Sequence, residues 1–220
     1  MSNKTIFAIL RGAGMTAEGA CGLMGNMMAE SGMKANIAQR GMTSMSDEQY
    51  TAEADSSIID FTRDSVGYGL CQWTYITRKA ALLSFARNRG VSVGDENMQV
   101  QFCLRELQQD YPMLMLKLCT STDIDECADR VCDQYERPAV NNYPVRRQYA
   151  RDFFNQFCGS DALYELRQEQ EPEINNTFNN TASQVANGFS GAFKTLAEYI
   201  QTKEFQDGFL AYVQGRKETL

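Results

Sequence analysis

The amino-acid sequence predicts a mainly α fold, with a small non-helical or short β lobe and a helical extension at the C-terminal end. Apolar residues recur at three- and four-residue steps in several segments, which is the spacing of an amphipathic helix. Glycine and proline stand between these segments, where they end helices. With 220 residues, 43% of them hydrophobic, the chain can form one large domain or one domain with an appendage.

Capping residues delimit the first two helices. Asn3 can cap a short helix that runs to Arg11, before glycines at positions 12 and 14. Thr16 can cap a second helix that continues to Glu30. Apolar side chains follow one face of this second helix: Ala20, Leu23, Met24, Met27 and Met28. We expect this face to pack in the core, which leaves Glu30 at the helix end.

The middle of the chain combines a polar segment with further helices. Residues 31–66 are rich in Ser, Thr, Asp and Glu, and the run 58–62 is their best candidate for a short strand or a hydrophobic plug. Beyond this segment, the periodicity and the stop signals at Gly90 and Pro112 predict four helices. They cover residues 76–89, 95–110, 124–135 and 145–157. We therefore place one domain at residues 1–159.

The composition changes after Gly159, and we assign residues 160–220 to a helical C-terminal extension. The polar stretch 175–180 fits a linker. An apolar stripe at mainly three- and four-residue steps follows: Phe178, Ala182, Val185, Phe189, Phe193, Leu196 and Ile200. This stripe can pack on the first domain, mediate self-association, dock on another protein or contact a membrane, although the acidic residues near it argue against the last.

Charge and residue content exclude several classes of protein. The net charge of −7 leaves no basic stripe for phosphates, which argues against nucleic acid as a partner. The chain has no histidine, so His-based triads and the usual zinc sites are excluded, and carboxylates remain as the natural acid–base groups. We expect no metal and no cofactor. The seven cysteines, which include no C-x-x-C pair, fit reduced and mostly buried thiols, although one or two disulfides are compatible with them.

Two short motifs carry most of the chemical information. In the first, 25–32 (G-N-M-M-A-E-S-G), Glu30 closes a helix that is almost free of charge. A carboxyl group there is expected to be partly desolvated and to retain its proton, which suits a general acid. The second motif is 67–74 (G-Y-G-L-C-Q-W-T), in which glycines allow a ligand to approach the backbone. Tyr68 and Trp73 offer flat surfaces for stacking on a sugar, and Gln72 offers a hydrogen-bonding amide.

The order and density of these motifs resemble the phage-tail lysozyme family, in which a G-N-x-x-x-E-S block precedes a G-[YF]-G-L-x-Q-W block. The resemblance covers roughly residues 12–158 and includes Arg78 and the runs 135–138 (Y-E-R-P) and 147–150 (R-Q-Y-A). It implies a lysozyme-like domain that acts on peptidoglycan with Glu30 as general acid. In this family the segment around Tyr135 faces the groove, so the resemblance implies Tyr135 as a sugar contact. A rim position of the core is the alternative for Tyr135.

Glycoside hydrolysis normally uses two carboxyl groups, so a second acid is needed. Asp64 precedes the glycine turn, as an acidic residue does in goose-type lysozymes, and is the first candidate for orienting a water molecule. Asp55 and Asp60 are alternatives. We interpret Glu136 and Arg137 as an ion pair or as helix-end charges rather than as catalysts.

Three functions are compatible with the motifs. The first is a muramidase that hydrolyses the β-1,4 bond between N-acetylmuramic acid and N-acetylglucosamine. The second is a lytic transglycosylase, for which Glu30 alone suffices. The third is a tail or wall-binding protein that kept the fold without activity, and the intact motifs argue against it.

We expect the chain to reach the cell wall as part of a phage tail, or from the host cytoplasm at lysis. Residues 1–10 have no features of a secretory signal, and no apolar run is long enough to span a bilayer. The expected partners are peptidoglycan and, through residues 160–220, phage tail proteins or a second copy of the chain.

Overall fold

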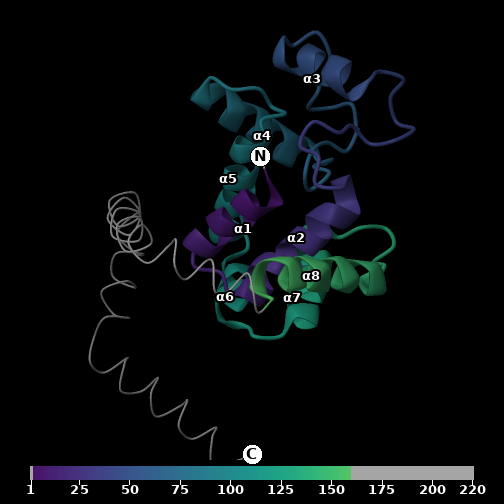
Figure 1. Ribbon diagram of the computed structural model, residues 1–220. Coiled ribbons are helices and arrows are strands. Elements are labelled where there is room, and N and C mark those ends of the chain that lie inside the picture. Colours follow the sequence, from purple (N-terminus) through teal and green to yellow (C-terminus); the bar gives the residue numbers. More distant parts are fainter. Residues whose placement is uncertain (1, 160–220) are drawn as a thin grey trace, which may run out of the picture. The chain divides into compact units, whose positions relative to one another are not determined.

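The computed structural model describes residues 2–159 of the chain (Figure 1). Within these residues the protein forms eight α-helices, one π-helical turn and no β-strand. The elements are α1 (Asn3–Gly12), α2 (Ala17–Ser31), α3 (Asp47–Asp55), α4 (Ile76–Arg89), α5 (Glu96–Gln109), α6 (Pro112–Thr120), α7 (Ile124–Val131), η1 (Cys132–Glu136) and α8 (Tyr143–Cys158). The mainly α prediction is confirmed, whereas the predicted extension at 160–220 lies outside the described residues.

The predicted small lobe consists of α3 and turns rather than strands. Two isolated β-bridges occur in the described part, between Ala38 and Tyr68 and between Tyr68 and Trp73. The predicted strand at 58–62 is wrong, because this run forms turns and leaves Ile58 exposed. Phe61 is buried within the same run, which agrees with the alternative of a hydrophobic plug.

Helix α2 is the central element of the domain and packs against α7 and α8 (Figure 1). Two glycines permit this close packing. A Cβ atom at Gly22 would lie 2.6 Å from the Cβ of Cys127 on α7, and one at Gly25 would lie 2.7 Å from the Arg146 carbonyl oxygen on α8. Helical backbone cannot move aside cheaply in a close-packed interior. The glycine of the first motif therefore lets α8 bring Arg146 to the face of α2.

Most helix ends agree with the sequence analysis. Thr16 caps α2 by accepting a hydrogen bond from Gly19 N at 3.0 Å, and α4 ends as predicted at Gly90, which has a left-handed φ of 65°. Ser2 caps α1 in place of Asn3. The helix predicted over 124–135 divides at Cys132, where the π-helical turn begins, and the sequence analysis predicts neither α3 nor α6. No helix within residues 2–159 has the length and apolar character that a membrane span requires.

Candidate active site

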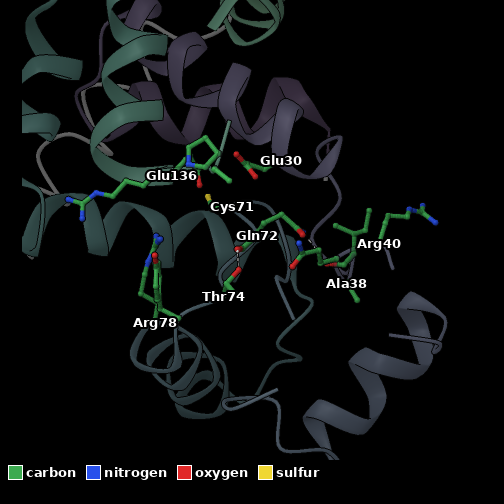
Figure 2. A pocket seen from close by; sticks show the side chains of 14 residues that line it. Glu30, Ala38, Arg40, Cys71, Gln72, Thr74, Arg78 and Glu136 are labelled. Carbon is green, nitrogen blue, oxygen red and sulfur yellow. Dashed lines mark hydrogen bonds between the residues drawn. The ribbon is translucent and has the colours of Figure 1, made fainter. Parts of the chain in front are cut away.

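A groove of about 560 Å³ lies at the C-terminal end of α2 (Figure 2). Its other walls come from the 37–40 loop, the 71–75 loop, the first turn of α4 and the segment that begins at the end of η1. Among the predicted site residues, Glu30 and Gln72 line this groove. The remaining four predicted residues lie outside its lining: Asp64, Tyr68, Trp73 and Tyr135.

Glu30 lies in the last turn of α2 and is held by a buried arginine. Its Oε1 accepts a hydrogen bond from Arg146 Nη2 at 2.5 Å, while the Glu30 side chain keeps 17% of its surface exposed. Arg146 also donates from Nη1 to Asn26 Oδ1 at 2.8 Å and from Nε to the Asn141 carbonyl at 2.9 Å. Asn26 is itself oriented by two hydrogen bonds from its Nδ2 to main-chain carbonyls.

The spacing of the first motif follows from this arrangement. Asn26 and Glu30 are four residues apart, so both side chains lie on one face of α2, where they contact the same guanidinium. Gly25 supplies the close helix approach that the guanidinium needs. The contact between Glu30 and Arg146 is a charge-assisted hydrogen bond, so the Glu30 carboxylate has a fixed counter-charge.

The second motif forms a tight turn at the groove wall. Tyr68 and Trp73 exchange main-chain hydrogen bonds of 3.1 and 2.9 Å. Gly69 has a φ of 75°, and a Cβ there would lie 2.4 Å from Oε1 of the buried Gln99 side chain. The Gln72 side chain donates to the Gly69 carbonyl at 3.1 Å. Glycine is therefore required both for the backbone conformation and for packing against Gln99, and Gln72 braces the turn while it lines the groove.

Three predicted sugar contacts are buried aromatic residues. Tyr68, Trp73 and Tyr135 are each exposed by 1% or less, so their rings offer no free face to the groove. Trp73 Nε1 and Tyr135 Oη donate to one carboxylate oxygen of Glu106 at 2.8 and 2.6 Å, and Arg78 binds the same carboxylate through two hydrogen bonds of 2.8 Å. Their contacts make these aromatic residues supports of the groove wall, and direct contact with a sugar stays a prediction.

Asp64 lies in an ion pair outside the groove lining. Its Oδ1 is 2.5 Å from Lys79 Nζ, and its Oδ2 accepts a hydrogen bond from the Tyr50 hydroxyl at 2.6 Å. Lys79 is fully buried, and this burial lowers the pKa of its ammonium group although Asp64 opposes the shift. Asp64 therefore anchors the chain before the second motif to α4, and its role as second carboxylate stays a prediction without support from its contacts.

Glu136 is a groove residue to which the sequence analysis assigns no catalytic role. It ends η1 and lines the groove near Glu30 (Figure 2). Burial, and secondly the negative charge of Glu30, raise the pKa of Glu136 well above its usual range, while Arg78 and Arg146 offset part of this effect. Within residues 2–159, the predicted ion pair between Glu136 and Arg137 does not occur, and the two residues lie at the end of η1, which agrees with the alternative of helix-end charges. Only the folded environment reveals this carboxyl group, because the charges that act on it, among them Arg78 and Arg146, come from distant segments of the chain.

The exposed lining residues indicate what the groove can bind. Tyr75 is 69% exposed, so it offers an aromatic ring to a ligand two residues after the buried Trp73. Arg40 and Arg137 are exposed in the same lining, which gives the groove positive charge in a chain with a net charge of −7. Within residues 2–159, no three His, Cys, Asp or Glu side chains are arranged to hold a metal ion, and all seven cysteines are free thiols.

A helical domain that presents carboxyl groups, an aromatic ring and amides in one groove has the features of a glycoside-cleaving enzyme. The chain belongs to the phage tail lysozyme family, which it matches over residues 2–157. It is also 27% identical over 153 residues to Morphogenesis protein 1 of Bacillus phage B103. That match covers 66% of this chain and 36% of the phage B103 protein. The family membership implies a peptidoglycan-degrading domain of a phage tail protein.

Proposed function

We propose that this chain is a muramidase that hydrolyses the β-1,4 bond between N-acetylmuramic acid and N-acetylglucosamine. The observation that carries the proposal is the position of Glu30, which lies in the groove of a phage tail lysozyme domain at the end of the central helix. In this mechanism Glu30 protonates the glycosidic oxygen as the bond to C1 breaks, and water completes the hydrolysis.

The other lining residues fit a muropeptide chain. Tyr75 is the exposed ring available for stacking on a sugar, and Gln72 can contact sugar hydroxyls from the groove wall. Arg40 and Arg137 suit the carboxylates of the lactyl and peptide groups, since guanidinium groups bind carboxylates through paired hydrogen bonds. Buried Tyr68, Trp73 and Tyr135 hold the wall in shape in this proposal.

Lytic transglycosylase activity is the second candidate, because the contacts of Asp64 favour a supporting role. If Asp64 does not orient a water molecule, the muramyl 6-hydroxyl can displace the leaving group with Glu30 alone as acid and base. The two products differ. Hydrolysis leaves a reducing muramic acid end, whereas transglycosylation leaves a 1,6-anhydro end.

Mass spectrometry of purified peptidoglycan after digestion tests the proposal. The wild-type chain is expected to release fragments with reducing muramic ends, and Glu30→Gln is expected to lower turnover by at least about 100-fold, the scale of a lost general acid. Glu18→Gln is the matched control, because it changes the other glutamate of α2 outside the groove. Near-normal turnover of Glu30→Gln refutes the assignment, and 1,6-anhydro ends establish the transglycosylase instead.

We also propose that the domain acts from a phage tail, where its partners are peptidoglycan and other tail proteins. The family and the similarity to a phage morphogenesis protein support this placement. The division at residue 159, with an associating extension at 160–220, is part of the same proposal. The family match, which ends at residue 157, supports the boundary.

A further inference from the structure

Glu136 is a second carboxyl group in the groove, and the mechanism above gives it no role. Its Oε1 is buried and has no hydrogen-bond partner within residues 2–159. Both Glu136 and Glu30 line the groove (Figure 2), and the negative charge of Glu30 acts on Glu136. The π-helical turn that ends at Glu136, followed by a left-handed φ of 52° at Arg137, places it there. Glu136 as a whole is half-buried, but a negative charge shared by a buried oxygen without a partner is costly, so this environment favours the protonated carboxylic acid.

The two arginines that act on Glu136 are already bound to other carboxylates. Arg78 donates twice to Glu106 at 2.8 Å, and Arg146 donates to Glu30 at 2.5 Å. Burial and the charge of Glu30 therefore raise the pKa of Glu136 well above its usual range in spite of both arginines. The titratable and charged groups that act on Glu136, or on which it acts, are Glu30, Cys71, Arg78, Cys103, Cys132 and Arg146.

Glu30 has the opposite environment. Glu30 accepts a hydrogen bond from Arg146, an arginine that is 4% exposed and fixed by Asn26 and by the Asn141 carbonyl. Glu30 therefore has a fixed hydrogen-bond donor, whereas the buried Oε1 of Glu136 has none within residues 2–159. Two carboxyl groups in one groove with contrasting surroundings commonly divide the acid and base functions between them.

We propose that Glu136 is a positioning residue that keeps Glu30 supplied with its proton. The two carboxyl groups hold one proton between them, and this proton is bound to Glu136 while the groove contains no substrate. The inference rests on the proposed role of Glu30 as general acid. When a sugar chain binds, the proton passes from Glu136 to Glu30, and from Glu30 to the glycosidic oxygen as the C1–O bond breaks. Water forms the new bond to C1 and returns one proton to the pair, so both groups end as they began.

The pH dependence of turnover distinguishes this role from a structural one. The pair of Glu30 and Glu136 must hold one proton for activity, so turnover falls as pH rises through the upper pKa of the pair. The surroundings of Glu136 raise this pKa above the usual range of a glutamate. Glu136→Gln has the size and neutrality of the protonated acid but no exchangeable carboxyl proton. We expect its kcat at neutral pH to fall by about 30-fold or more, and the basic limb of its pH profile to move to lower pH. Its Tm should stay near that of the wild type.

Two further variants give the matched comparisons. Glu136→Asp restores a carboxyl group and is expected to recover part of kcat with the wild-type position of the basic limb. Asp110→Asn changes an exposed acid at the end of α5, outside the groove lining, and is expected to leave kcat and the pH profile unchanged.

Carbon-13 NMR of glutamate carboxyl groups in the wild-type chain provides a readout that needs no variant to fold. One glutamate is expected to titrate well above the usual range, and Glu30→Gln should lower this pKa because it removes the neighbouring negative charge. If no glutamate titrates in this way, or if Glu136→Gln keeps wild-type kcat and pH profile, the shared proton is refuted. Either result leaves the muramidase proposal standing as long as the wild type cleaves peptidoglycan and Glu30→Gln does not.

Discussion

The contacts of Glu106 predict that Glu106→Gln destabilises the domain strongly. Glu106 is 5% exposed and binds Arg78, Trp73 and Tyr135 at once. Glutamine keeps the shape, but it removes the charge and turns an NH2 group toward donors. Removing one partner of a buried ion pair costs about 3–5 kcal/mol. Because the Arg78 side chain keeps 17% of its surface exposed, water can reach it, and we expect the lower end, about 3 kcal/mol of unfolding free energy.

Urea unfolding, followed by the fluorescence of Trp73, measures this loss directly, since the indole is the only one in the chain and bonds to Glu106. A loss of this size corresponds to a fall in Tm of about 6–12 °C for a chain of this length. Glu126→Gln is the matched control, because Glu126 forms its ion pair with Lys117 at the surface and should lose no more than about 1 kcal/mol. An equal loss in the two variants would refute the view of Glu106 as the common anchor of the groove wall.

Three other outcomes are expected. Asp64→Asn leaves the fully buried Lys79 without its counter-charge and should lower the unfolding free energy by about 3 kcal/mol, with turnover of the folded fraction within about tenfold of wild type. The control is Asp60→Asn, which changes an exposed acid. A loss of turnover of about 100-fold in Asp64→Asn at unchanged Tm would restore Asp64 as the second acid. Tyr75→Ala should raise KM by about tenfold without changing kcat or Tm, because a lost ring contact is worth about 1 kcal/mol or somewhat more. The control is Ile76→Ala at the adjacent exposed residue, which should leave KM, kcat and Tm unchanged. Equal effects of the two variants on KM would remove Tyr75 from the substrate site. A chain that ends at Gly159 should keep turnover on soluble peptidoglycan fragments but differ from the full chain in light scattering, and a folded but inactive truncation would show that the boundary is wrong.

Local signals explain why many helices could be predicted from the sequence. Thr16 begins α2 by accepting a hydrogen bond from a neighbouring backbone amide, and Gly90 ends α4 by adopting a positive φ. Both effects depend only on neighbouring residues, so they can be predicted from the sequence. Pro112 illustrates the limit of such signals. In the sequence it indicates the end of one helix, but it is also the first residue of α6, a position that proline favours.

The site was harder to predict because burial is decided by distant segments. An aromatic residue in a glycine-rich turn can face a ligand or the core, and the sequence shows no difference between Trp73, which is buried on Glu106, and Tyr75, which is exposed in the groove. Asp64 has the same ambiguity, since its partner Lys79 belongs to α4. The position of Glu30 at the end of α2 could be predicted because the end of an apolar helix is a local property of the sequence.

The packing of α8 on α2 explains the residues of the first motif. Gly25 allows α8 to approach α2, Asn26 orients the guanidinium of Arg146, and Glu30 receives that guanidinium one turn later. The same arginine therefore fixes the geometry of Glu30 and lies against it as a counter-charge. In the proposed mechanism, the carboxyl group of Glu136 in the same groove supplies the proton that Glu30 transfers. The position of the acid and its proton thus come from different helices, which is why no single motif of the sequence contains both.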